Sequence, residues 1–210
     1  MRFVLASQSP ARLGVLRAAG IEPVVRVSGV DEDAVAASLV EPKPAELVVA
    51  LAAAKAEVVV AGLDGELSEA VVVGCDSMLL MDTPRGPEVV GKPATVEVAR
   101  ERWGHMAGRS GELLTGHAVV RISAGQVVDR AQETMSTTVR WSSPSPAELE
   151  AYLASREPLH VAGAFTLDGL GGWFVEGVDG DPSSVIGISL PLTRRLLSAV
   201  GVSVTDLWRQ

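Results

Sequence analysis

The sequence predicts an α/β fold with a mixed sheet, in a single domain that covers residues 1–210. In its first half, short apolar runs alternate with longer stretches of helical periodicity, which is typical of parallel strands joined by helices. Residues from about 111 to 141 instead alternate polar and apolar side chains, as antiparallel strands do. No linker-like composition separates two independent domains, although one domain of this size can contain lobes.

The first half predicts the order β-α-β-α-β. Residues 2–7 (RFVLAS) form a short strand, and a helix follows because Ser9 is a favourable N-cap and Pro10 suits the first helical position. Gly20 predicts the end of this helix at about Ala19. The later elements of this half are predicted as a strand at about 23–27, a helix at about 44–61 and a buried strand at 71–75.

The second half is predicted to mix antiparallel strands with helices. A turn at Arg85-Gly86 lies between short apolar runs, and another at Ala124-Gly125 divides the alternating segment. The helices of this half are predicted near 95–107, 145–154 and 191–200, with a glycine-rich segment at 163–174 (GAFTLDGLGGWF) before the last.

The composition disfavours several classes of protein. A net charge of −8 and a pI near 4.9 disfavour binding to a nucleic acid polymer, which usually needs a basic surface. Scattered histidines without a CxxC or HExxH pattern give little support to a zinc site. The apolar run before Ser7 is too short for a signal-peptide core or a membrane span, and the single cysteine, Cys75, fits a reducing compartment. We therefore expect a cytoplasmic protein with no membrane partner.

Ser7 and Ser9 lie where the first strand passes into the first helix. Their hydroxyls and the free N–H groups of the helix start, together with the helix dipole, favour an anion such as phosphate. The same residues also make an ordinary helix cap. Arg12 favours the phosphate interpretation, because the helix dipole opposes a cation in the first turn and the guanidinium therefore needs another partner.

Two of the lysines have unusual surroundings. Lys55 shares a predicted helical face with Leu47 and Leu51, so its ammonium either extends past this face to water or binds an anion such as phosphate. Lys92 ends a string (GPEVVGK) that nearly has the Walker-A spacing, but Pro93 stands where that motif needs Ser or Thr. We therefore exclude a P-loop, while Lys92 can still attract an anion by charge alone.

Acidic residues stand out at two places. Asp76 interrupts an apolar stretch, where an ionised carboxylate is costly without a metal, a cation or several N–H donors. It stands at the end of a predicted buried strand, where open α/β sheets carry functional groups, although a strand-end turn also accounts for it. The cluster VDED at 30–33 offers either a magnesium ligand or a solvated loop or helix cap. The C-terminal segment 163–192, which combines glycines with Asp168, Asp179, Asp181 and two adjacent serines, either lets the backbone approach a ligand closely or forms a set of turns between short strands.

Taken together, these features resemble the Maf family of nucleoside triphosphate pyrophosphatases over essentially the whole chain, with actinobacterial members most similar. The resemblance implies an elongated, two-lobed α/β fold like that of inosine triphosphate pyrophosphatase, with a cleft between the lobes and homodimers common. The blocks that carry it are LASQSPARLGVL at 5–16, VDED at 30–33, AAAKA around Lys55, GCDS at 74–77, GKP at 91–93, SGELLTGHAVV at 110–120 and AGAFTLDGLGG at 162–172.

The resemblance also implies roles for particular residues. Its phosphate-binding positions match Ser7, Arg12, Lys55 and Lys92, its acidic metal-site positions match Glu32 and Asp76, and Asp76 matches the proton acceptor. Three positions associated with base preference depart from the usual family residues: Ala11 for Arg, Ser77 for Thr and Asp168 for Gln.

The implied activity is a hydrolase reaction that splits a nucleoside triphosphate, standard or modified, into a nucleoside monophosphate and pyrophosphate. The expected cofactor is Mg²⁺ or Mn²⁺ held by Glu32 and Asp76, with Asp76 accepting a proton as hydroxide attacks the α-phosphorus. An alternative of another class is a nucleotide-binding regulator of cell division whose turnover is incidental or absent. We favour the enzyme, because a pure binding protein has no need of Asp76 beside phosphate ligands.

Overall fold

A computed structural model describes residues 1–63 and 67–209 of the chain. The described residues form two compact units. The first unit draws on Met1–Asp76, Thr115–Met135 and Gly187–Gln210, and the second on Ser77–Leu114 and Ser136–Ile186. Because the strands β3, β5 and β6 each contribute residues to both units, every unit is assembled from distant parts of the sequence.

The described strands form a mixed sheet in the order β2-β1-β3-β5-β6-β7, with β4 paired to β3. Strand β1 runs parallel to both β2 and β3, whereas the pairs β3–β4 and β6–β7 are antiparallel. The mixed α/β fold is therefore confirmed. The strands are β1 (Arg2–Leu5), β2 (Val24–Val25), β3 (Ala70–Thr83), β4 (Gly86–Val90), β5 (Ser110–Ser123), β6 (Gln126–Trp141) and β7 (Val175–Asp179).

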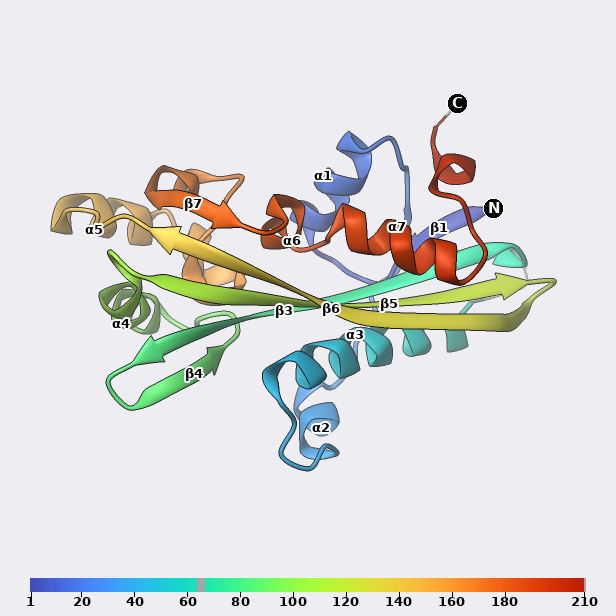
Figure 1. Cartoon of the computed structure of the whole chain (residues 1–210), viewed down its shortest axis with the longest axis horizontal. Helices are drawn as coiled ribbons and strands as arrows, with labels where there is room; N and C mark the ends of the chain where they lie inside the picture. The colour runs from blue at the N-terminus through green and yellow to red at the C-terminus, as the bar shows by residue number, and fades with distance from the viewer. Residues whose placement is uncertain (64–66, 210) are drawn as a thin grey trace. The chain divides into compact units, whose positions relative to one another are not determined.

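In the first unit, helices cover both faces of the sheet (Figure 1). Alternate strand residues face opposite sides, so Leu5 and Val73 pack against α1 (Pro10–Ala18) and α7 (Leu190–Ala199). Their neighbours Val4 and Val72 pack against α3 (Pro44–Ala61) on the other side. A short helix, α2 (Glu32–Ala37), contacts α3.

Helix α3 lies unusually close to the sheet because two glycines face it. A Cβ built on Gly74 of β3 would lie 2.2 Å from the carbonyl oxygen of Ala52, and one on Gly116 of β5 would lie 2.2 Å from that of Val48. Only glycine permits this approach of backbone to backbone. The contact at Gly74 brings the strand that leads into Asp76 against the helix that carries Lys55.

The second unit has an aromatic core between its helices and strands. Trp103 of α4 (Val96–Met106) is fully buried, makes edge-to-face contacts with Tyr152 and Phe174, and donates a hydrogen bond from Nε1 to the carbonyl oxygen of Ala164 at 2.8 Å. The other elements of this unit are α5 (Pro146–Ala154), α6 (Pro182–Ile186) and the 3₁₀ turns η2 (Glu157–His160), η3 (Ala162–Ala164) and η4 (Leu170–Phe174).

Most predicted elements are confirmed, and the differences have local causes. The turn at Ala124-Gly125 joins β5 to β6 with φ of 49° and 74°, the positive values that a tight hairpin requires. Strand β3 continues well beyond the predicted 71–75, since its pairing with β4 extends it to Thr83. The strand expected at 23–27 is paired only at Val24–Val25, and η5 (Val204–Leu207) near the chain end was not predicted.

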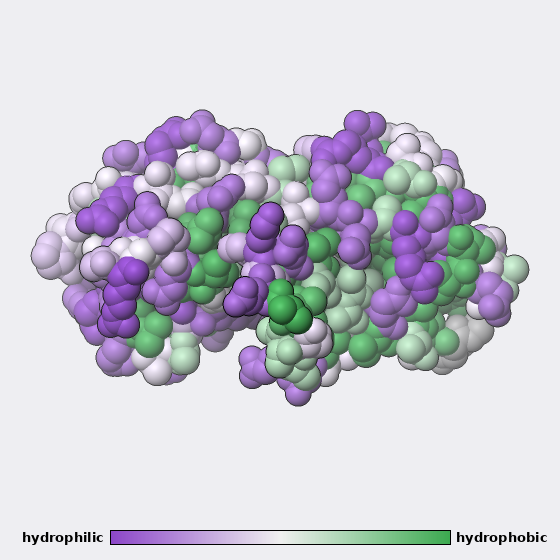
Figure 2. Space-filling view, turned by 60° about the horizontal axis from the view of Figure 1, so that its bottom comes forward, coloured by the Kyte–Doolittle hydropathy of each residue, from purple (hydrophilic) through white to green (hydrophobic). Residues whose placement is uncertain are grey.

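The surface of the molecule mixes polar and apolar side chains. Figure 2 displays hydrophobic residues among hydrophilic ones across the face that it shows. Val40 and Trp173 are the most exposed of the large hydrophobic residues described, at 93% and 85%. Among the described residues, no helix combines the length and the apolar character needed to cross a membrane.

Candidate functional site

Two of the predicted phosphate-binding residues, Ser7 and Arg12, lie together at the start of α1. Ser9 caps the helix by accepting a hydrogen bond from the N–H of Arg12 at 3.4 Å, and Pro10 occupies the first helical position, as predicted. The hydroxyl of Ser7 accepts hydrogen bonds from Ser9 N at 3.2 Å and Arg12 Nη1 at 3.1 Å. Arg12 and Ser7 are therefore brought together. Ala11 is half-buried beside Arg12 in the same helical turn.

Arg12 has a further partner from the far end of the chain. Its Nε donates a hydrogen bond to the carbonyl oxygen of Gly187 at 2.8 Å. Gly187 has φ of +127°, and a Cβ there would lie 3.2 Å from both Cγ and Nε of Arg12. Gly187 thus presents its carbonyl oxygen to the guanidinium in a backbone conformation that other residues rarely adopt.

Lys55 joins the two carboxylates predicted as metal ligands. Its Nζ lies 2.5 Å from Oδ1 of Asp76 and 2.7 Å from Oε1 of Glu32. The side chains of Lys55 and Asp76 are only 12% and 10% exposed, whereas that of Glu32 is 53% exposed. The ammonium therefore neither extends past the helix into water nor stands without a charged partner: it lies between a buried and an exposed carboxylate.

The strand of Asp76 and the helix of Lys55 explain why these side chains meet. Gly74 allows β3 to approach α3 closely, so the side chain two residues later reaches the lysine one turn along the helix. Glu32 comes from the first turn of α2, where Asp31 caps the helix by accepting from Ala34 N at 3.0 Å. The segment 30–33 is thus a helix cap and also supplies a carboxylate to Lys55.

Asp76 is more basic than an ordinary aspartate. Burial raises the pKa of Asp76, and the nearby cations Lys55 and Arg12, which favour the charged form, do not cancel this effect. A smaller raising effect comes from Glu32. Arg12 is close enough to lower the pKa of Asp76. The pair Ser7–Arg12 and the cluster around Lys55 therefore belong to one electrostatic environment. A carboxylate with a raised pKa is better able to accept a proton.

The carboxylate pair fits a divalent cation of the magnesium type. Asp76 and Glu32 offer oxygen ligands that already converge on one cationic atom, Lys55 Nζ. Within the described ranges, no group of three or more His, Cys, Asp or Glu residues is placed to hold a metal. Two carboxylates are nevertheless the donor set expected for Mg²⁺, which is commonly held by one or two carboxylates together with substrate phosphates and water.

Three other predicted site residues belong to the second unit. Ser77 directly follows Asp76 in β3 and is half-buried. Lys92 is exposed just after β4, and the carbonyl oxygen of the preceding Gly91 accepts hydrogen bonds from Arg102 Nη1 at 2.7 Å and Gly163 N at 3.1 Å. No helix begins at Lys92 or Pro93, and α4 starts only at Val96, which agrees with the exclusion of a P-loop.

Asp168 is exposed on a loop of the second unit that is fixed by one carboxylate. Glu157 accepts hydrogen bonds from Thr166 Oγ1 at 2.6 Å and from the N–H groups of Leu170 and Gly171, each at 3.1 Å. These partners flank Asp168 on both sides along the chain. The glycine-rich segment contains the 3₁₀ turns η3 and η4, and Glu157 holds the loop between them through these hydrogen bonds.

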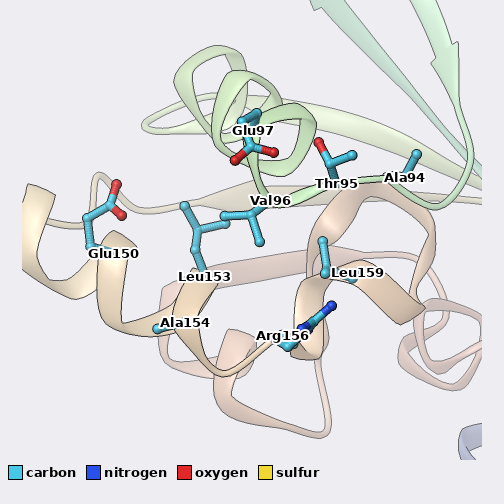
Figure 3. Close-up of a pocket in the computed structure, with 9 residues that line it drawn as sticks. All are labelled: Ala94, Thr95, Val96, Glu97, Glu150, Leu153, Ala154, Arg156 and Leu159. Carbon is cyan, nitrogen blue, oxygen red and sulfur yellow. The ribbon is translucent and has the colours of Figure 1, made fainter.

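The second unit also contains a surface pocket without the expected chemistry. It has a volume of about 510 Å³ and lies between α4 and α5, where Val96 and Leu153 point toward one another (Figure 3). Its charged lining consists of Glu97, Glu150 and Arg156. None of the predicted site residues lines it.

Several contributors to the site were not predicted. Each of them makes a hydrogen bond to a residue that is distant in sequence. The separation is 175 residues for Gly187, 11 for Arg102 and at least 9 for Glu157. No local pattern marks such contacts, although a glycine in an otherwise apolar segment is a sign that Gly187 has a special conformation.

Comparisons with known proteins identify the family of the chain. The sequence model of the family described as Maf-like protein matches residues 2–200. A protein of Saccharopolyspora erythraea named nucleoside triphosphate pyrophosphatase is 69% identical over 208 residues, which cover 99% of this chain and 97% of that protein. Proteins with the same name from Nocardia farcinica and Rhodococcus opacus are 64% and 63% identical, covering 99% and 98% of this chain and 96% and 95% of theirs. The chain therefore belongs to the Maf family.

Proposed function

We propose that this protein is a nucleoside triphosphate pyrophosphatase, which hydrolyses standard or modified nucleoside triphosphates to a nucleoside monophosphate and pyrophosphate. The observation that carries the proposal is the buried contact between Lys55 and Asp76 at 2.5 Å, in the electrostatic environment of Arg12. A base and two cations close together are what attack on a phosphate requires. The names of the similar proteins support the same activity.

In this mechanism Asp76 is the proton acceptor. Water attacks the α-phosphorus, its proton passes to Asp76 Oδ, directly or through a second water, and the bond from the α-phosphorus to the oxygen bridging the β-phosphorus breaks. The electron pair leaves with pyrophosphate. The raised pKa of Asp76 supports this role, because burial makes its carboxylate a stronger base.

The cations supply binding and charge stabilisation. Arg12 lies at the N-terminus of α1 with the hydroxyl of Ser7, where the helix dipole also favours an anion. Lys55 can exchange a carboxylate for a phosphate oxygen, since Asp76 and Glu32 both compete for one ammonium. Lys92, which is exposed, is proposed as a further phosphate ligand.

Mg²⁺ or Mn²⁺ is the proposed cofactor, with Glu32 and Asp76 as its protein ligands. When bound, such an ion neutralises phosphate charge and orients the triphosphate. The residues of the chain fit this role because their carboxylates already share one cation.

Ala11, Ser77 and Asp168 are proposed to set the base preference. Ala11 has no side chain that reaches a base, and the exposed carboxylate of Asp168 accepts hydrogen bonds but donates none when ionised. This combination should favour a base edge that carries amino donors.

The proposed function is tested by incubating the protein with a panel of standard and modified nucleoside triphosphates and identifying the products. We expect a monophosphate and pyrophosphate with Mg²⁺ or Mn²⁺, and no turnover once the metal is chelated. Release of orthophosphate and a diphosphate would contradict the mechanism. If nucleotides bound tightly with no turnover at all, the alternative of a nucleotide-binding regulator of cell division would be favoured.

We also propose a cytoplasmic location and a role without a nucleic acid or membrane partner. Cys75 is buried and free, and burial raises the pKa of its thiol to about 11, which suits a cysteine kept reduced. The net charge of −8 opposes binding to a polyanion. A homodimer, which is common in the family, remains a prediction that light scattering coupled to gel filtration would test.

A further inference from the structure

His117, in the motif TGH of β5, is fully buried and has polar partners on both ring nitrogens. Its Nδ1 lies 2.9 Å from the carbonyl oxygen of Thr115, and its Nε2 accepts a hydrogen bond from the backbone N–H of Ser189 at 2.8 Å. A carbonyl oxygen can only accept and a backbone N–H can only donate. The ring is therefore neutral, with its hydrogen on Nδ1.

Ser189, the hydrogen-bond partner of His117, lies at the start of α7. Ser189 is the N-cap of α7, and its hydroxyl accepts a hydrogen bond from Leu192 N at 3.1 Å. The preceding residues are the fully buried Ile188 and then Gly187, whose carbonyl oxygen accepts from Arg12 Nε at 2.8 Å. Two hydrogen bonds and the three consecutive residues 187–189 thus connect His117 to the guanidinium of Arg12.

The contact between Gly187 and Arg12 leaves the arginine side chain little space to move. The backbone of Gly187 is close enough to Arg12 that a Cβ there would lie only 3.2 Å from the arginine side chain. We therefore expect a small shift of the segment 187–189 to move or release the guanidinium. Arg12 needs such a restraint because the positive end of the α1 dipole repels it.

We propose that His117 is a positioning residue for phosphate binding: by holding Ser189 N, it fixes Gly187 so that its carbonyl group orients Arg12 toward the substrate. This inference rests on the proposed function, because it assigns His117 to the same site. A purely structural histidine would hold α7 against the sheet but would have no particular effect on Arg12.

Two substitutions separate the two hydrogen bonds of the ring. His117→Gln places an oxygen near the position of Nε2 and can still accept from Ser189 N. His117→Asn reaches only the position of Nδ1, so it keeps a donor toward Thr115 O and loses the acceptor toward Ser189. We expect His117→Asn to lower kcat/KM for a nucleoside triphosphate roughly tenfold, and His117→Gln to stay within about threefold of the wild type.

A double-substitution cycle with Arg12→Ala tests whether the effect passes through Arg12. If it does, His117→Asn should lower kcat/KM in the wild-type background but not when Arg12 is already alanine. The control is Leu196→Ala, which removes a buried side chain from the same helix. It should lower the melting temperature without changing kcat/KM.

A second pair of variants covers the case in which His117→Asn does not fold. Ser189 has φ of −74°, which proline can adopt, so Ser189→Pro removes the N–H that His117 accepts. Ser189→Ala keeps this N–H and loses only the capping hydroxyl. Ser189→Pro should reproduce the roughly tenfold loss, again only when Arg12 is present, and Ser189→Ala should not.

The possible results distinguish the positioning role of His117 from the proposed function. An active wild type in which the effects of His117→Asn and Arg12→Ala simply multiply would overturn the positioning role and leave the proposed function intact. Equal losses for His117→Gln and His117→Asn would overturn it as well. A wild type that consumed no nucleoside triphosphate would overturn both the proposed function and this inference.

Discussion

Lys55 Nζ lies 2.5 Å from Asp76 Oδ1, and both side chains are almost completely buried. The same ammonium also contacts the exposed Glu32 at 2.7 Å. Asp76 is not tolerable as a buried ion without Lys55, because removing an ion from water without a partner costs several kcal/mol, whereas Lys55 has a second charged partner in Glu32. The lysine is thus both a structural partner of the carboxylates and a cation available to a phosphate, and substitutions at its two ends should have different consequences.

Asp76→Asn should preserve the fold and reduce kcat by about 10²- to 10⁴-fold, the range usual for loss of a general base. The amide nearly preserves the shape of the side chain, and Lys55 retains Glu32 as a charged partner. Steady-state kinetics at saturating metal and a melting curve measure the two effects. A variant that keeps half of the turnover would assign Asp76 to the scaffold instead.

Lys55→Ala and Lys92→Ala should both reduce kcat/KM, but only the first should strongly reduce stability. Removing Lys55 leaves the carboxylate of Asp76 buried without its cation, which costs on the order of 3 kcal/mol in unfolding free energy. Lys92 is exposed, so its loss should change stability by less than about 0.5 kcal/mol. Urea unfolding alongside kinetics distinguishes the two. Equal stabilities would mean that Asp76 finds another cation.

The surroundings of Lys55 and Asp76 show which features of the site can be predicted from the sequence and which cannot. Helical periodicity placed Lys55 on an apolar face, and the apolar run marked Asp76 as anomalous, so both were recognised as needing partners. That they are each other's partner depends on the approach of β3 to α3 at Gly74, which is a tertiary contact. The helix caps at Ser9, Asp31 and Ser145 were local and predictable. The contact of Arg12 with Gly187 was not.

Gly74→Ala should destabilise the protein severely, by roughly 3 kcal/mol or more, because its Cβ would lie 2.2 Å from the carbonyl oxygen of Ala52 and backbone would have to move. Activity should fall with it, since Asp76 follows two residues later. Gly14→Ala is the matched control: that glycine lies within α1 with nothing within 4 Å of the added methyl group. It should stabilise the protein by up to about 1 kcal/mol. Similar melting temperatures for the two variants would contradict the close approach.

Glu157→Gln should loosen the loop of Asp168 and lower stability by roughly 1–2 kcal/mol at neutral pH. Partial burial by itself raises the pKa of Glu157, but hydrogen bonds from Thr166 and from Leu170 and Gly171 N–H outweigh it and hold the pKa below its ordinary value. The stabilisation is therefore present above the unfolded-state pKa of about 4.3 and is lost as the pH falls through the lower folded-state value.

The measurement for Glu157 is a comparison of melting temperatures between pH 7 and pH 3. The difference between wild type and Glu157→Gln should shrink as the pH falls, because a growing fraction of the wild-type carboxyl is then neutral, as the amide is in the variant. A difference that did not depend on pH would show that the charge of Glu157 does not hold the loop.

Asp168→Gln should change which base is preferred. In the wild type, the exposed carboxylate is an acceptor only, so it should favour guanine and cytosine, which carry amino groups, and disfavour the O4 edge of uracil or thymine. Glutamine can donate as well as accept. The ratio of kcat/KM for uracil or thymine nucleotides to that for guanine or cytosine nucleotides should therefore rise about tenfold, as expected when one hydrogen bond worth roughly 1–2 kcal/mol changes partner.

The base panel needs a control that leaves the shape of the loop unchanged. Asp168→Asn introduces the same amide on a shorter side chain, so a direct contact with the base should give a smaller shift than Asp168→Gln, whereas a long-range charge effect should give the same shift for both. Because Glu157 holds the neighbouring residues through Thr166, Leu170 and Gly171, either substitution should leave the melting temperature nearly unchanged. An unchanged ranking of nucleotides in both variants would show that Asp168 does not contact the base.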